Sequence, residues 1–506
     1  FGGLLSSSKD PYRNARIEVR VGDYAFDNAN FNTAFGERAG VVSRGLPQED
    51  RVDALRRELW LGLDVAYKGA TEQMAAKLSA LEGQPPRKLP DLSQVPPLKT
   101  EPLDRPRVDE ARVQELVASL SARLERWEGI EEAESIARVW SGARMLCSSE
   151  GARAWLPTGF AVVRVEGVFR AEDGSRLRGS RSWVAADIDG LPSMEEMFDE
   201  VDDLGAWLSD LRDAPIEEDY LGPVLMEGPA AVEMFRQVLL PEISGTPPAM
   251  EAPDGFQQNA QPTPTARLGR RLLPGGWRVV DDPTADMRLA GAYDYDFEGV
   301  AGERVVLVED GVARDLLMSR IPRSDVEGTN GHGRSLGVDR RVGMPSVVTV
   351  TPKRSKSSRR LEKKATGLAR QAGRDYVLVV KRLEPPALAE DFRVAFSGEG
   401  PLPGITRPLE AYRLYADGRR EPVRGLEFLG VDRRTLRDIA VAGGVTGPIN
   451  VLDAGPGAQR FSIGAVGGLP ATWSAPAVVI TEMELRGSGG AEPRVISPPP
   501  VSKTND

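Results

Sequence analysis

Cysteine and histidine are nearly absent from this sequence of 506 residues, which contains one residue of each type. A single cysteine, Cys147, excludes a disulfide bond within the chain. With His332 as the only imidazole, the chain lacks the histidine and cysteine ligands of an ordinary zinc site. Long apolar runs are also missing, since no stretch reaches the roughly 20 residues that a membrane-spanning helix needs. We therefore expect no membrane span.

A net positive charge is absent as well. The 65 lysine and arginine residues are outnumbered by 75 aspartate and glutamate residues, which gives a formal net charge of −10. This acidity disfavours broad binding to a phosphate backbone. One basic segment, residues 353–364, has no aromatic residue among its charges, so we interpret it as a solvated helix start or a docking patch. No nucleic-acid partner is expected.

The length of the chain predicts two domains, residues 1–218 and residues 219–506, in an α+β fold. The second domain opens with a strand that ends near residue 226 and a helix that Pro229 begins. Short strand-and-turn segments follow, which are typical of a β-rich, barrel-like domain. The glycine- and proline-rich residues from about 488 onward are predicted to form a disordered tail.

In the first domain, apolar residues recur every three or four positions over residues 50–82 and 109–127, which predicts two amphipathic helices. Asp109 is placed to cap the second helix. Short alternating runs between residues 135 and 187 predict an antiparallel sheet with these helices on one face. Cys147 falls in one of the strands, and we interpret it as a small buried hydrophobic residue.

Residues 220–245 resemble the part of the TldD/PmbA family of paired metallopeptidases that carries the motif His-Glu-x-x-x-His. The same frame reads MEGPAA here, so Met226 and Ala231 stand at the two histidine positions. The third ligand of the family is a cysteine in a glycine-rich turn, and Ala454 stands at that position. A thioether and two methyl groups cannot replace zinc ligands. The resemblance therefore implies a PmbA/TldE-like member without a metal or cofactor of its own.

Two further blocks carry the resemblance, YDFEGV at residues 295–300 and TNGHGR at residues 329–334. On this basis the candidate substrate-binding residues are Asp296, Glu298, Asn330 and His332, although a lone histidine in a glycine-rich turn is more often structural.

Glu227 is the one residue of the metal motif that remains. It is either a residual catalytic acid or an acid at a helix N-terminus, where the helix dipole favours it.

The resemblance implies a non-catalytic subunit of a heterodimeric metalloprotease that degrades or processes unfolded peptides, with zinc held by a homologous TldD-like partner. Peptides would be bound by strand addition, which accepts many sequences. One alternative is a stand-alone peptide-binding or structural homo-oligomer without peptidase activity. Another is an unrelated enzyme that uses Glu227, His332 and Asp296. Whether the chain itself is an enzyme stays open, and we expect a cytoplasmic protein.

Overall fold

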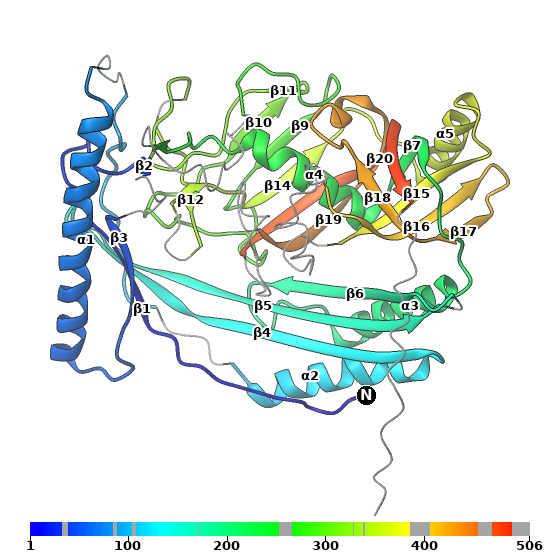
Figure 1. Cartoon of the computed structure of the whole chain (residues 1–506), viewed down its shortest axis with the longest axis horizontal. Helices are drawn as coiled ribbons and strands as arrows, with labels where there is room; N and C mark the ends of the chain where they lie inside the picture. The colour runs from blue at the N-terminus through cyan, green and yellow to red at the C-terminus, as the bar shows by residue number, and fades with distance from the viewer. Residues whose placement is uncertain are drawn as a thin grey trace, which may run out of the picture.

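The computed structural model describes most of the chain, with a few gaps (Figure 1). The described residues are 1–32, 39–83, 89–103, 108–171, 173–251, 266–326, 328–336, 340–384, 405–453 and 468–487. Ala454 and the predicted tail from residue 488 lie outside these ranges. The α+β fold class predicted from the sequence is confirmed, since helices and several sheets alternate along the chain.

The first helix, α1 (Val52–Ala80), confirms the helix predicted over residues 50–82. It lies against an antiparallel pair of strands, β1 (Asn14–Glu18) and β3 (Val41–Gly45). Gly62 and Gly69 allow this close approach, because a Cβ atom at either position would collide with the β1–β3 unit or the residues that lead into it. The prediction that the sheet of residues 135–187 carries this helix is wrong. Periodicity shows that a helix has an apolar face but not which surface covers that face.

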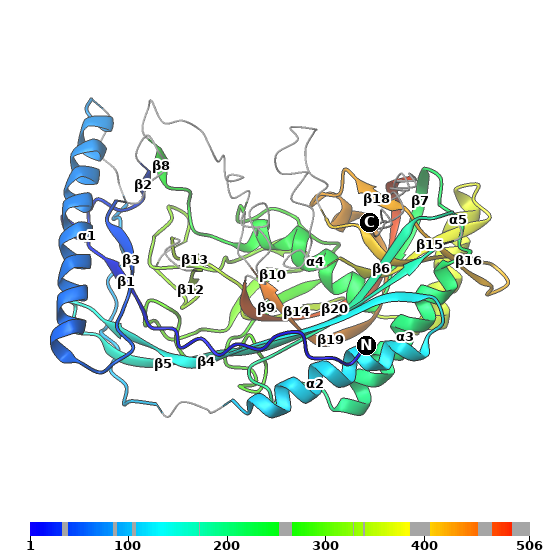
Figure 2. The ribbon, with the colours of Figure 1, turned by 60° about the horizontal axis from the view of Figure 1, so that its bottom comes forward.

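A second unit is the antiparallel sheet of β4 (Ile130–Cys147), β5 (Arg153–Arg170) and β6 (Arg176–Ala185), in that order. Helices α2 (Glu110–Arg123) and α3 (Met194–Leu211) cover one face of it (Figure 2). The short helix η1 (Leu124–Arg126) extends α2. As predicted, Asp109 caps α2 by accepting a hydrogen bond from the Arg112 amide at 3.3 Å. The antiparallel sheet predicted for residues 135–187 is confirmed, as is the packing of α2 on one of its faces.

Cys147 is exposed, so its interpretation as a buried residue is wrong. It is the last residue of β4, an edge strand. The apolar cluster beneath α2 and α3 takes its β4 members from the first half of the strand, at Ile130, Ala133 and Ala137. The second half of β4 extends past these helices, so alternation alone could not tell which positions are covered.

The C-terminal half is built on an eleven-stranded mixed sheet. Its main path runs β11-β10-β9-β14-β20-β7-β15-β16-β17, while β18 and β19 pair with β20. The strands are β7 (Tyr220–Met226), β9 (Arg278–Asp281), β10 (Val305–Glu309), β11 (Val312–Ala313), β14 (Val347–Thr351), β15 (Tyr376–Leu383), β16 (Pro408–Tyr415), β17 (Arg420–Val423), β18 (Leu426–Leu429), β19 (Ile439–Asp453) and β20 (Leu469–Gly487). Within the described ranges the sheet is open rather than closed into a barrel.

Helices cover both faces of this sheet. Alternate residues of the central strands face α4 (Gly228–Ile243) on one side and α5 (Ser358–Gln371) on the other. In β15, Leu378 and Val380 belong to the α4 cluster, whereas Val377 and Val379 belong to the α5 cluster. Burial on both faces explains why β7 and β15 are nearly continuous apolar runs.

The remaining short elements join the two halves or order the loops. Strand β2 (Phe31–Asn32) pairs in parallel with β8 (Met250–Glu251), so the N-terminal segment reaches the C-terminal half. Strands β12 (Gly333–Arg334) and β13 (Val342–Gly343) form a small antiparallel pair, and η3 (Thr435–Asp438) precedes β19. The boundary at residue 218 stays a prediction. No helix in the described part of the chain has both the length and the apolar character needed to cross a bilayer.

Candidate functional site

The turn between β7 and α4 lies in the middle of the large sheet. β7 pairs in parallel with β15 and antiparallel with β20, and the Glu227 amide donates to Val380 at 2.9 Å. Gly228 has a φ of +46°, a conformation that glycine adopts without steric cost. Pro229 follows in the first turn of α4, as predicted, where its missing N–H is not needed. This sharp turn fixes Glu227 at the start of the helix.

The Glu227 side chain does not cap α4. Its Oε2 atom instead accepts a hydrogen bond of 2.8 Å from the hydroxyl of Tyr412 on β16. Arg420 on β17 donates to the same hydroxyl, and its other nitrogen lies 2.7 Å from Glu362 on α5. Burial, together with the charge of Glu227, raises the pKa of Tyr412. Glu227 is thus one end of a polar chain that joins the sheet to both helices.

The fold brings together the four candidate substrate-binding residues, Asp296, Glu298, Asn330 and His332, in what we call the turn cluster. Asp296 is fully buried, and its carboxylate accepts hydrogen bonds from the backbone amides of Glu298, Val300 and Gly333 at 2.8–3.0 Å. Glu298 accepts from the Arg320 amide at 2.7 Å. These contacts order two loops that are far apart in the sequence.

The other half of the turn cluster is equally enclosed. Asn330 accepts from the Met318 amide and donates to the Leu316 carbonyl, each at 2.8 Å. His332 is fully buried, and its Nδ1 lies 2.9 Å from the Asn330 carbonyl oxygen. Its Nε2 lies 3.7 Å from an oxygen of buried Asp281. Burial opposes ionisation of Asp281, but His332 and hydrogen bonds from Ser346 lower its pKa.

The side chains of the turn cluster therefore form their hydrogen bonds with other groups of the same chain. Backbone amides and carbonyls satisfy the carboxylates and the amide, which is the usual state of buried polar groups. A role for Asp296, Glu298, Asn330 and His332 in substrate binding stays a prediction.

Comparison with known proteins gives the same family along independent routes. Residues 222–381 match the model of the PmbA/TldA metallopeptidase C-terminal domain. A metalloprotease of Archaeoglobus fulgidus is 38% identical over 73 residues, which are 14% of this chain and 17% of that protein. A metalloprotease of Methanothermobacter thermautotrophicus is 46% identical over 54 residues, 11% of this chain and 12% of that protein. The matched segments thus span less than a fifth of these relatives.

The structural comparison extends over almost the whole chain. TldE from Thermococcus kodakarensis superposes with a TM-score of 0.54 at 13% identity, covering 89% of this chain and 88% of that one. At this identity the likeness concerns the fold. Residues 222–381 thus match the PmbA/TldA metallopeptidase family, and most of the chain shares the fold of TldE. The family assignment drawn from the MEGPAA, YDFEGV and TNGHGR segments is confirmed.

In the segment that resembles the TldD/PmbA metal motif, the two described residues at the histidine positions have apolar side chains. Met226 and Ala231 are both fully buried in the core between α4 and the large sheet. Zinc requires imidazole, thiolate or carboxylate ligands, so these two side chains do not fit the ion. Ala454 lies outside the described residues. Among the described residues, no three His, Cys, Asp or Glu side chains gather in a group that could hold a metal.

A buried ion cluster lies close in sequence to the frame, on α4 and at the end of β19. Arg236 lies 2.7 Å from Glu233 and 3.4 Å from Asp453, and all three side chains are almost fully buried. No sequence pattern predicted this cluster. The partner of Glu227 was not predicted either, because Tyr412 is 185 residues away along the chain.

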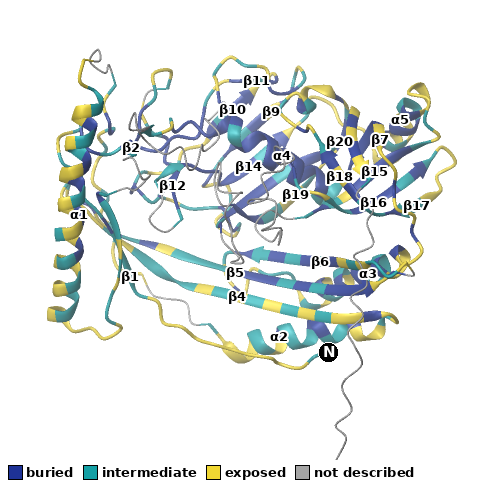
Figure 3. Cartoon of the chain, viewed as in Figure 1, coloured by how far each residue is buried: buried dark blue, intermediate teal, exposed yellow. Residues whose placement is uncertain are grey.

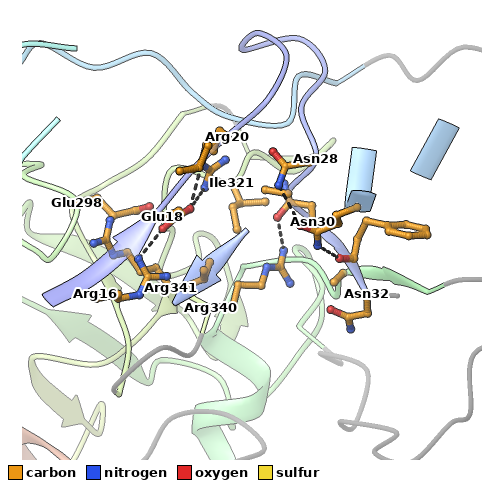
Figure 4. A pocket seen from close by; sticks show the side chains of 16 residues that line it. Arg16, Glu18, Arg20, Asn28, Asn30, Asn32, Glu298, Ile321, Arg340 and Arg341 are labelled. Carbon is orange, nitrogen blue, oxygen red and sulfur yellow. Dashed lines mark hydrogen bonds and ion pairs between the residues drawn. The ribbon is translucent and has the colours of Figure 1, made fainter. Parts of the chain in front are cut away.

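Sequence analysis missed one more site, a polar cleft lined by Arg16, Glu18 and Arg20 (Figure 4). A signal for it was present. Charged residues alternate along this segment, so a strand period of two places all three on one face.

Proposed function

We propose that this chain is the non-catalytic, PmbA/TldE-like subunit of a metallopeptidase that acts on unfolded peptides, and that a homologous TldD-like subunit holds the zinc. The observation that supports this proposal is that Met226 and Ala231, which stand at the histidine positions of the resemblance, belong to the hydrophobic core. A chain that keeps the family fold without these ligands has a clear use as half of an assembly.

An exposed apolar stripe on α1 supports association with another subunit. Val52, Trp60 and Tyr67 are 58–65% exposed and lie on one side of the helix. Leu59, Leu63 and Leu78 extend the same stripe. Exposed residues lie along the length of α1 (Figure 3). Contiguous apolar surface of this kind marks protein–protein contacts. We propose that the partner subunit covers it.

An unpaired strand edge supports binding of extended peptides. Strand β4 has 18 residues, and within the described ranges it pairs on one side only, with β5. A free edge presents backbone N–H and C=O groups that an extended chain can pair with, whatever its side chains are. Strand addition would therefore suit a substrate class defined by its lack of structure.

Reconstituted proteolysis tests the proposal. Glu227→Gln in this chain should leave cleavage of an unfolded peptide by the pair within a few-fold of the wild-type rate. The same change in the motif glutamate of the TldD-like partner should cost on the order of 10²–10⁴ in rate, as expected for loss of a general base. Silencing of an intact complex by Glu227→Gln here would show that this chain carries catalytic chemistry. A chain that never associates with the homologue, at any concentration tested, would favour the stand-alone homo-oligomer instead.

A further inference from the structure

A narrow cleft lies where the β1–β3 unit meets the C-terminal half of the chain (Figure 4). Arg16, Glu18 and Arg20 line one side, and Arg340, Arg341 and Glu298 come from the other half. The cleft has a volume of about 40 Å³, which is space for roughly three water-sized groups. Four guanidinium groups reach this cleft, although apolar residues such as Val19, Phe31 and Ile321 also line it.

Most of the charges at the cleft are paired. Glu18 is shared by two arginines, with Arg16 at 2.5 Å and Arg20 at 3.0 Å, and Arg20 also lies 2.8 Å from Asp27. Arg340 donates to the Asn30 side chain at 3.1 Å. Four arginines therefore line the cleft, and with Asp27 counted beside Glu18 and Glu298 three carboxylates face them, which leaves one positive charge in excess.

Arg341 is the exception. In the described part of the chain its guanidinium makes no hydrogen bond or ion pair, and its Nε atom is buried without a partner. Burial lowers the pKa of Arg341, whereas the nearby Glu18 and Glu298 carboxylates act in the opposite direction. A buried guanidinium nitrogen without an acceptor is costly, so its presence calls for an explanation.

A second arginine adds to the positive charge behind Arg341. Arg144 on β4 stacks on the Phe297 ring at 3.3 Å and makes no ion pair with a described residue. Burial, followed by the charges of Arg341, Arg334 and Arg16, lowers the pKa of Arg144 to about 9. Repulsion between these like charges favours an anion near them.

We propose that the cleft binds a carboxylate, that of a peptide C-terminus, with Arg341 as its anchoring side chain. A carboxylate has three heavy atoms, which matches the volume of the cleft. Its two oxygens suit the fork of a guanidinium, which can bind them with parallel hydrogen bonds. The assignment to a peptide rests on the proposed function, whereas the preference for a carboxylate rests on the cleft alone.

The experiment measures binding by the wild-type chain without any partner subunit. Fluorescence anisotropy compares a short, unstructured, labelled peptide that ends in a free carboxylate with the same peptide amidated at its C-terminus. We expect the free acid to bind about tenfold more tightly or better, the range expected for a hydrogen-bonded charge pair. Arg341→Gln should abolish this difference. Arg354→Gln removes the same charge from an exposed position before α5 and should preserve it.

Three outcomes would overturn the proposal. Equal affinity for the acid and the amide would do so, as would a preference for the acid that survives in a folded Arg341→Gln variant. Tight binding of an amidated peptide that ends in aspartate would assign the carboxylate to a side chain. If Arg341→Gln does not fold, Arg341→Lys provides the test, because it keeps the charge without the fork and should reduce the preference. None of these results depends on proteolysis. A failure of the carboxylate-binding proposal can therefore be distinguished from a failure of the proposed function.

Discussion

The hydroxyl of Tyr412 donates a 2.8 Å hydrogen bond to Glu227, the residue that stands at the motif glutamate of the family. Tyr412 is buried, whereas Glu227 is half-buried at the start of α4. A carboxylate held by a phenol and, through it, by Arg420 is anchored to the sheet. This geometry gives Glu227 a structural role in joining α4 to the sheet.

Removal of the Tyr412 hydroxyl should therefore be costly. Tyr412→Phe leaves the half-buried Glu227 carboxylate without its donor, and we expect a loss of about 1–3 kcal/mol in the free energy of unfolding. The control is Tyr415→Phe on the same strand, because Tyr415 donates to the more exposed Glu421, which water can solvate. The free energy of unfolding of Tyr415→Phe should fall by less than about 1 kcal/mol. Urea denaturation measures both, and equal losses would contradict the assigned role of Glu227.

The turn cluster leaves no space for a side chain at position 333. A Cβ atom on Gly333 would collide with the Glu298 carboxylate and lie 3.0 Å from an Asp296 oxygen. We expect Gly333→Ala to lower the free energy of unfolding by about 1–3 kcal/mol through overpacking. Gly367→Ala in α5 is the matched control, since no atom lies within 4 Å of its added methyl group. The free energy of unfolding of this variant should rise by up to about 1 kcal/mol, because alanine has a higher helix propensity than glycine. A Gly333→Ala variant with an unchanged free energy of unfolding would refute the tight packing around position 333.

Asp296 makes stability depend on pH in a particular direction. Burial and the neighbouring Glu298 carboxylate raise the pKa of Asp296 to about 7, whereas an unfolded aspartate titrates near about 3.9. Between these values the native state binds more protons than the unfolded state, so the free energy of unfolding should fall as pH rises from about 4 to about 7.

Glu298→Gln isolates this effect. It removes the neighbouring charge but keeps an oxygen that can accept from the Arg320 amide. Across this pH window the variant should lose less stability than the wild type, whereas Glu303→Gln, at an exposed position nearby, should follow the wild type. Denaturant unfolding at a series of pH values measures the slopes. Parallel slopes for wild type and Glu298→Gln would show that the two carboxylates are not coupled.

Local chemistry in the sequence was sufficient to locate the main helices. Three- and four-residue apolar spacing located α1 and α2, and Pro229 marked the start of α4. These elements depend on contacts between near neighbours in the chain, so a linear pattern contains the information. The three family segments were legible for the same reason, since each is a short contiguous run.

Only the tertiary structure decided how these pieces meet. The sequence placed Glu227 at a helix start, but its partner Tyr412 comes from a strand 185 residues later. It suggested a shared role for Asp296 and His332 but not that backbone amides enclose them. The surface beneath α1, the exposure of Cys147 and the unpartnered Arg341 follow from which strands became neighbours. The sequence determined the helices and the family segments, because each is local. The sites depend on long-range pairing of strands, which no local pattern encodes.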